Sequence, residues 1–316
     1  MLTLLSWQEE AWSRLPVNDA LPHALLLHGP VGIGKRLFAE RLAARLVCEE
    51  GIVCGTCRAC RLVASGNHPD ILPVTPAAGK TEITVEEVRA LNHFAVLTPH
   101  MGPRRVVVIT SADRLNRSAA NALLKTLEEP ASGGYLVLVS DNPARLLPTV
   151  RSRCQRIVLA RPPEALALRY LEGRQTAHPN ATLALAHGAP LAAEALPQDI
   201  LETGLRLLKT LDAVGVGEES AAQASEAWHN VDLTLGLGLL LDILEGLAQI
   251  VLGEDKPSRF GQEWHTRLQA TAIRLDLHQV FGIWDEALEL YGFIDAPLDR
   301  RLIWDRLFLR FEPQRA

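Results

Sequence analysis

The feature that most constrains the fold is a glycine-rich turn between a short apolar run and an amphipathic segment. The run HALLLH (23–28) has the length and composition of a buried strand, and the segment from Lys35 to about Glu49 has helical periodicity. Between them, GPVGIGK matches the pattern G-x-x-x-x-G-K through Gly29, Gly34 and Lys35. A strand that enters a helix through such a turn is typical of a parallel α/β sheet.

The first half of the chain continues this alternation of strands and helices. Thr84 and Glu87 have the spacing of a capping box, so we expect a helix to begin there. The alternation predicts a mostly parallel, doubly wound sheet, whereas beyond two consecutive prolines only helical periodicity remains. We therefore expect an α/β domain at 1–160, a small helical domain at 161–203 and a larger all-helical domain at 204–316. The first helix of the larger domain is expected to begin at 204.

Charge and composition restrict the function. The 316 residues carry a formal net charge of −5, with 48% apolar and 22% charged residues, so the chain has no general basic field for nucleic acid. The most apolar window, 231–253, contains Asp232, Asp242 and Glu245, which favours a buried helix and leaves a membrane span as the second alternative. The first twelve residues lack the pattern of a signal peptide, so we expect a cytoplasmic protein without a membrane partner.

The glycine-rich turn predicts a phosphate-binding loop. Gly29, Gly32 and Gly34 would let backbone N–H groups converge on a phosphate, and Lys35 would contact its oxygens. The alternative is a tight turn that needs glycines for its own geometry. The next residue is Arg36, which offers no oxygen to Mg²⁺, where such loops carry Ser or Thr.

The strand VVVI (106–109) is a second departure from a working nucleotide site. Nucleotide-driven machines end this strand in two acids that hold Mg²⁺ and orient water, and here Thr110 and Ser111 follow. Asp113 lies too far along and is expected to make a local contact. Phosphoryl transfer depends on positioning and charge neutralisation, so we expect no Mg²⁺ site and negligible hydrolysis. Whether ATP or ADP binds weakly to the loop is left open.

Four of the five cysteines fall within thirteen residues. Cys48, Cys54, Cys57 and Cys60 include two overlapping C-x-x-C units, a spacing that predicts a structural Zn²⁺ site in a module at 48–68. His68 is the alternative fourth ligand, and free cysteines in a loop are the alternative to any metal. The fifth cysteine, Cys154, is expected to be a small buried residue.

Taken together, these motifs resemble the δ′ subunits of bacterial DNA polymerase III clamp loaders, which are AAA+ proteins. The loop, CGTCRAC, NHPDI, SAANALLKTLEEP and LLPTVRSRC occur in this order between residues 23 and 160. The resemblance implies an AAA+ domain, a helical lid and a helical collar that holds a five-subunit ring. In that family δ′ has lost the catalytic acids of its ATPase relatives. Where active relatives carry a lid arginine, this chain has Pro190 and Leu191.

The resemblance also assigns a role to Arg153. The sequence Ser152–Cys154 resembles the family's arginine-finger motif, which implies that Arg153 reaches the γ-phosphate held by the adjacent ATPase subunit. The alternatives are an arginine that only forms a salt bridge at a strand start, or a finger at Arg151. The glutamates of LEEP, Glu128 and Glu129, are interpreted as a helix end rather than as catalytic groups.

The function that follows is a non-hydrolysing subunit of a DNA-directed DNA polymerase complex, with no catalysis of its own. The implied partners are the γ/τ ATPase subunits and the clamp-opening δ subunit in a hetero-pentameric ring, with the sliding clamp and primer–template DNA contacted through the complex. The alternatives are a stand-alone AAA+ ATPase with an atypical site and a zinc-containing DNA-binding protein.

Two further groups of residues are expected to be structural. Five basic residues near the presumed ring interior are interpreted mainly as scattered surface charge: Arg104, Arg105, Arg114, Arg117 and Lys125. An apolar stripe near the C-terminus is assigned to core packing or to a collar interface, which the sequence cannot separate: Leu298, Ile303, Leu307 and Leu309.

Overall fold

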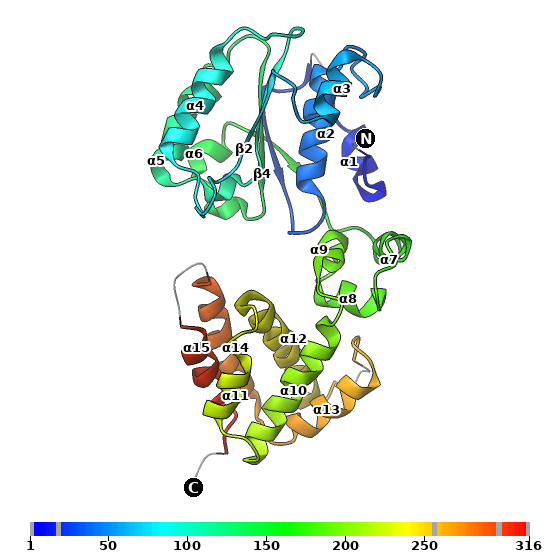
Figure 1. Cartoon of the computed structure of the whole chain (residues 1–316), viewed down its shortest axis with the longest axis vertical. Helices are drawn as coiled ribbons and strands as arrows, with labels where there is room; N and C mark the ends of the chain where they lie inside the picture. Colours follow the sequence, from blue (N-terminus) through cyan, green and yellow to red (C-terminus); the bar gives the residue numbers. More distant parts are fainter. Residues whose placement is uncertain (1–2, 17–19, 255–257, 295–298, 314–316) are drawn as a thin grey trace. The chain divides into compact units, whose positions relative to one another are not determined.

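The computed structural model describes residues 3–16, 20–254, 258–294 and 299–313, and these residues form two compact units. The sheet unit comprises Met1–Arg169 with Ala189–Ala192, and the helical unit comprises Tyr170–Gly188 with Ala193–Ala316. Figure 1 shows the sheet with its covering helices in the first unit and only helices in the second. The finer division into three domains at residues 160 and 203 stays a prediction.

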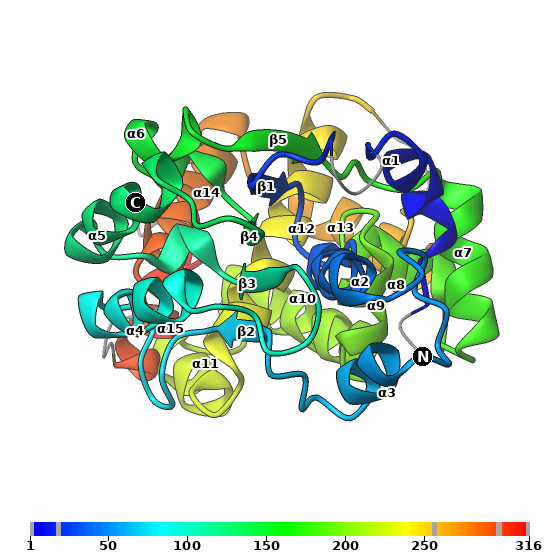
Figure 2. The same cartoon turned by 90° about the horizontal axis from the view of Figure 1, so that it is seen from above.

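The sheet is parallel, and its strands lie in the order β2-β3-β4-β1-β5 (Figure 2). In the register, Leu26 of β1 is opposite Leu138 of β4, and Val107 of β3 is opposite Leu136 of β4. The predicted parallel sheet is therefore confirmed. The strands are β1 (Ala24–His28), β2 (Ile71–Val74), β3 (Arg105–Ile109), β4 (Gly134–Ser140) and β5 (Gln155–Val158).

The sheet lies between two layers of helices because its central strands are apolar on both faces. Leu25 and Val108 pack with α2 (Lys35–Val47) on one face. Leu26 and Val107 pack with α4 (Val85–Val96) and α5 (Arg117–Glu128) on the other. Successive side chains of a strand alternate between faces, so one continuous apolar run supplies both cores. Figure 1 shows α2 on one side of the strands and α4 and α5 on the other.

The helix signals in this unit act locally. Thr84 and Glu87 form the predicted capping box at the start of α4. Asn116 caps α5 by accepting a hydrogen bond from the backbone N–H of Ala119 at 2.9 Å. Shorter helices fill the connections around the sheet: α1 (Glu9–Ser13), α3 (Arg58–Ala64) and α6 (Pro148–Arg151).

The C-terminal part is entirely helical in the residues described, as predicted. Trp228 and Trp304 lie at the centre of its core, with ring centroids 5.5 Å apart. The first long helix begins at Ile200, earlier than the expected start at 204, because Ile200 is already buried against this core. The helices are α7 (Glu164–Gly173), α8 (Pro179–Leu185), α9 (Pro190–Ala195), α10 (Ile200–Val216), α11 (Ala221–Trp228), α12 (Leu233–Val251), α13 (Gln262–Ala272), α14 (Leu277–Gly292) and α15 (Arg300–Phe308).

The most apolar window forms α12. By length and composition this helix could cross a membrane, but Leu237, Leu240 and Ile243 are buried in the helical core. The C-terminal stripe divides between two environments: Ile303 and Leu307 are buried, Leu309 is exposed, and Leu298 lies outside the described residues.

Candidate functional site

The turn between β1 and α2 packs closely against its own chain. Gly32 and Gly34 have φ values of 75° and 86°, and Gly34 is the N-cap of α2. A Cβ atom at Gly29 would lie 2.0 Å from the carbonyl oxygen of Leu159, and one at Gly32 would lie 2.5 Å from Cβ of Ala192. The glycines are therefore required by the turn's own packing, whether or not a phosphate binds.

Lys35 is buried and has anionic and polar partners within the protein. Its Nζ donates to the carbonyl oxygens of Gly29, at 2.8 Å, and of Pro30. The same atom lies 2.6 Å from Oδ1 of Asp141, in the residue after β4. The ammonium group that was expected to contact a phosphate is thus already neutralised by a carboxylate of the same chain.

Asp141 was not identified from the sequence, although a signal was present. It immediately follows a long apolar strand, and the carboxyl ends of parallel strands are where α/β folds place their ligand-binding groups. Because β4 pairs with β1, with Ser140 opposite His28, the residue that follows β4 lies next to the glycine-rich turn.

The residues at the usual Mg²⁺-binding positions make contacts of their own. Arg36 donates from Nε to Glu40 at 2.8 Å, and the Thr110 hydroxyl donates to the Val74 carbonyl at 3.3 Å. Asp113 makes the local contact that was expected, accepting a hydrogen bond from the backbone N–H of Asp141 at 3.3 Å. None of the residues at positions 36, 110 and 111 is a carboxylate, so those positions supply no acid for a metal.

The four clustered cysteines come together as a compact group. Their Sγ atoms all lie within 4.8 Å of one another, with 3.8 Å between Cys48 and Cys54 and 4.0 Å between Cys54 and Cys60. A tetrahedral zinc with Zn–S bonds of about 2.3 Å separates its sulfur atoms by roughly 3.8 Å. The donor set and its spacing are therefore consistent with a structural zinc site.

Two of these sulfur atoms accept hydrogen bonds from nearby backbone N–H groups. The backbone N–H of Cys57 donates to Sγ of Cys54 at 3.4 Å, and that of Cys60 donates to Sγ of Cys57 at 3.3 Å. Hydrogen bonds from Thr56 and from the Cys57 N–H lower the pKa of Cys54 to about 6, whereas burial raises the pKa of Cys60 to about 12. The group thus contains one thiol that readily forms the thiolate that binds metal.

The alternative fourth ligand, His68, lies outside the cysteine cluster. Its Nδ1 accepts a hydrogen bond from the backbone N–H of Asp70 at 3.1 Å, and the cluster of potential metal ligands found in the described residues consists of the four cysteines. Cys154 lies outside this cluster and is buried, and burial raises its pKa to about 11.

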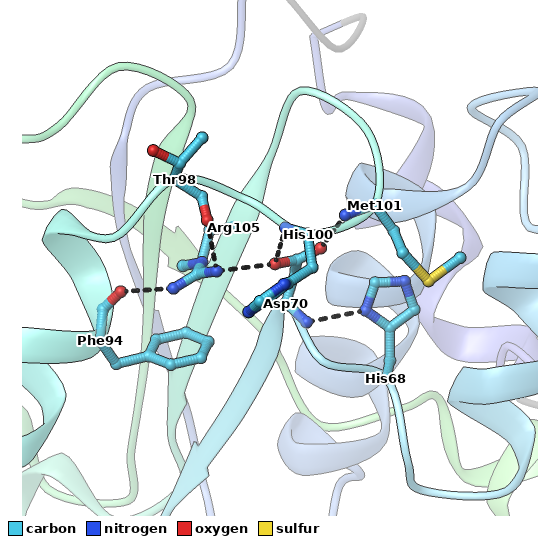
Figure 3. A network of polar contacts seen from close by, with 7 residues as sticks. All are labelled: His68, Asp70, Phe94, Thr98, His100, Met101 and Arg105. Atoms are coloured by element: carbon cyan, nitrogen blue, oxygen red, sulfur yellow. Dashed lines mark hydrogen bonds and ion pairs between the residues drawn. The ribbon is translucent and has the colours of Figure 1, made fainter.

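A buried ion pair lies at the edge of the sheet after the cysteine module (Figure 3). Nη2 of Arg105 donates to Oδ1 of Asp70 at 2.9 Å, and both side chains are almost completely buried. The backbone N–H groups of His100 and Met101 donate to the same carboxylate, each at 2.7 Å. Burial alone raises the pKa of Asp70, but these hydrogen bonds outweigh it and leave the pKa below its usual value.

The interpretation of Arg105 as surface charge was therefore wrong. Its guanidinium also donates to the carbonyl oxygens of Phe94, at 2.9 Å, and Thr98, at 2.8 Å, and lies over the Phe94 ring. Figure 3 shows the guanidinium enclosed between these groups and Asp70. Through these hydrogen bonds Arg105 holds the loop between α4 and β3 to the strand edge, and they offset part of the cost of burying its charge.

Arg153 lies on the surface just after α6. Its Nη2 is 2.6 Å from Oε1 of Glu128, and its side chain is 37% exposed. The rival Arg151 is half-buried, and its Nη1 donates back to the Pro143 carbonyl at 3.3 Å. Of the two arginines, Arg153 has the more accessible guanidinium.

Comparison with known proteins places these features in a family. Residues 7–163 match the sequence family described as DNA polymerase III, delta subunit. The δ′ subunit of DNA polymerase III from Pseudomonas aeruginosa is 37% identical over 264 residues, which is 81% of this chain and 80% of that protein. The DNA polymerase III subunit tau of Escherichia coli is 31% identical over 78% of this chain and 38% of its own length.

A solved structure supports the fold. A DNA polymerase III γ-subunit-related protein from Thermotoga maritima superimposes with a TM-score of 0.50 at 18% sequence identity, covering 96% of this chain and 98% of that one. The predicted AAA+ fold is confirmed by this likeness and by the parallel five-stranded sheet. With the extent of the sequence match to δ′ proteins, the chain belongs to the δ′ subunit family of the bacterial DNA polymerase III clamp loader.

Proposed function

We propose that this protein is a non-hydrolysing subunit of the clamp loader, with the nucleotide fold used as a scaffold. The observation that carries the proposal is the neutralisation of Lys35 by Asp141 and two carbonyl oxygens. With Arg36, Thr110 and Ser111 at the positions of the Mg²⁺ and water-orienting groups, a bound phosphate would lack the charge neutralisation that its transfer requires. Hydrolysis by this chain is therefore negligible, and any nucleotide binding is weak.

The chemical contribution of this subunit is made to its neighbour. Arg153 stabilises the charge that develops on the γ-phosphate of the adjacent ATPase subunit, in the manner of an arginine finger. Three features support this role: the SRC motif, the exposed position of the guanidinium and the tethering of Arg151 to Pro143.

The rest of the chain provides assembly surfaces and local stability. A lid at 161–203 and a collar at 204–316 hold the subunit in a cytoplasmic five-membered ring with the γ/τ and δ subunits. The ring acts on the sliding clamp and on primer–template DNA. Zn²⁺ bound by Cys48, Cys54, Cys57 and Cys60 stabilises the module after α2, where closed thiolate coordination leaves no position for a catalytic water.

The test is reconstitution of the loader with γ/τ and δ subunits, followed by measurement of clamp- and DNA-stimulated ATP hydrolysis. Arg153→Ala should lower the turnover roughly tenfold or more, because an arginine finger acts mainly in the transition state. Arg161→Ala is the matched control, since Arg161 is also exposed and its side chain forms no hydrogen bond or ion pair among the described residues. Unchanged turnover with Arg153→Ala would refute the finger.

Measurements on the isolated chain separate the alternative functions. Sustained ATP hydrolysis by the isolated chain, lost on Lys35→Ala, would support a stand-alone ATPase. Tight DNA binding by the isolated chain at physiological salt would support a zinc-containing DNA-binding protein, which the net charge of −5 disfavours.

A further inference from the structure

Arg153 has a partner that the sequence did not suggest, at the end of a different helix. Oε1 of Glu128, the last residue of α5, accepts a hydrogen bond from Nε of Arg153 at 2.8 Å and lies 2.6 Å from its Nη2. Nη1 donates to the Thr149 carbonyl at 3.1 Å and lies 3.4 Å from Oγ of Ser152. The carboxylate thus occupies one edge of the guanidinium, while the backbone of α6 occupies Nη1.

These contacts leave one donor at the outer end of the guanidinium available, on Nη2. A guanidinium carries five N–H donors, two of them on each terminal nitrogen. Because the Glu128 oxygen spans Nε and Nη2, the second hydrogen of Nη2 faces the terminal edge and has no partner among the described residues. This remaining N–H can donate a charge-assisted hydrogen bond to a phosphate oxygen while the carboxylate holds the other edge.

The pair is placed where it can orient a side chain but contributes little to folding. Glu128 is 50% exposed and Arg153 is 37% exposed, and ion pairs of this kind add little to the stability of a protein. Helices α5 and α6 pack together in the sheet unit, so the carboxylate is supplied from a fixed position (Figure 1). A long arginine side chain held in one orientation loses less conformational freedom when it meets its target.

We propose that Glu128 is the positioning residue of the arginine finger, holding the Nε–Nη2 edge of Arg153 so that the remaining N–H of Nη2 points to the neighbouring subunit's γ-phosphate. The inference rests on the proposed role of Arg153. Glu128 does not contact the nucleotide, and it acts only through the arginine. The LEEP segment, which from the sequence was interpreted as no more than a helix end, then contributes to the turnover of the ring.

The experiment measures ATP hydrolysis by the reconstituted loader carrying Glu128→Ala. We expect kcat to fall about fivefold with the KM for ATP unchanged, because the arginine is disordered rather than removed. Glu128→Gln keeps an acceptor oxygen in place and should retain more than half of the wild-type kcat. Glu129→Ala is the matched control, since it removes the same charge from the adjacent exposed residue, whose side chain forms no hydrogen bond or ion pair among the described residues.

The double variant Glu128→Ala/Arg153→Ala separates the positioning role of Glu128 from the finger role of Arg153. It should be no slower than Arg153→Ala alone, because a positioning residue has no effect once its target is absent. If Arg153→Ala lowers turnover but Glu128→Ala leaves it unchanged or raises it, the positioning role is wrong and the finger stands. Additive losses in the double variant would also overturn it. Wild-type turnover in Arg153→Ala itself would instead reject the proposed function.

Discussion

Lys35 and Asp141 form an ion pair across the ends of two neighbouring strands, with Nζ of the lysine 2.6 Å from Oδ1 of the aspartate. Lys35 follows the turn after β1, Asp141 follows β4, and these strands are paired in the sheet. The Asp141 carboxylate lies beside the lysine ammonium group, where a phosphate would otherwise bind. The fold therefore satisfies with its own residues the group that a nucleotide phosphate would use.

The first prediction is that removing this carboxylate improves nucleotide binding without restoring hydrolysis. In Asp141→Asn the lysine loses its negatively charged competitor, so the isolated chain should bind ADP roughly tenfold more tightly. Turnover should stay negligible, because Arg36, Thr110 and Ser111 still supply no acid for Mg²⁺. Isothermal titration calorimetry with ADP and a phosphate-release assay measure the two quantities.

Two controls accompany this measurement. Asp113→Asn changes a nearby carboxylate that contacts the Asp141 backbone rather than Lys35, and should have little effect on the dissociation constant. Adding Lys35→Ala to Asp141→Asn should abolish the gain. Equal affinity of the wild type and Asp141→Asn would mean that the ion pair does not restrict the loop.

The sequence was sufficient wherever the signal was local. The apolar run of β3 predicted a central strand, because strands covered on both faces need no polar alternation. Thr84 and Glu87 predicted a helix start because a capping box closes within one turn. The four cysteines predicted a cluster because two overlapping C-x-x-C units place their thiols on one tight turn.

The interactions that the sequence did not reveal join residues brought together only by the folded sheet. Arg105 looks like a surface charge at a strand start, and its partner Asp70 lies on the neighbouring strand edge. Asp141 reaches Lys35 only because β4 inserts beside β1, an arrangement that strand patterns do not specify. Periodicity shows which face of an element is apolar, but it does not show which charges will meet across elements.

The second prediction concerns the metal. Protein prepared without chelators should contain about one zinc per chain by mass spectrometry of the metal, and Cys57→Ser should lower this content strongly, because a tetrahedral thiolate site needs all four ligands. Removal of zinc by a chelator should lower the melting temperature. Cys154→Ser is the matched control, since it changes a buried cysteine outside the cluster and should keep the full metal content.

Two results would contradict the predicted zinc site. Wild-type protein that contains no zinc after expression in zinc-supplemented medium would show that the four sulfur atoms are free thiols. Zinc retained in Cys57→Ser at the wild-type level would show that the metal is bound elsewhere.

The third prediction is a pH dependence of the helical unit that arises from one buried acid. Burial of Asp242 on α12, with a smaller contribution from the negative charge of Glu245, raises the pKa of this carboxyl group to about 7. His187 is a candidate cation for this carboxylate, with Nε2 3.9 Å from Oδ1 of Asp242. In the unfolded chain this carboxyl group has its ordinary pKa of about 3.9, so between these two values the folded state binds the additional proton.

The sign of the effect follows from that difference. Where the folded state binds more protons, the free energy of unfolding falls as pH rises, so stability should decrease between about pH 4 and pH 7 and then level off. The contribution of Asp242 is on the order of 4 kcal/mol over the whole interval. Asp242→Asn, which removes the charge and keeps the shape, should be more stable than the wild type at pH 8, with a smaller difference at pH 5.

Urea unfolding followed by circular dichroism at pH 5, 6, 7 and 8 measures the difference in free energy of unfolding between the variant and the wild type. Asp285→Asn makes the same chemical change at an exposed position of α14 and should give a difference close to zero at every pH. A difference between Asp242→Asn and the wild type that does not change with pH would show that Asp242 stays ionised in the folded protein. In that case His187, or water reaching the carboxylate, must compensate its charge inside the helical core.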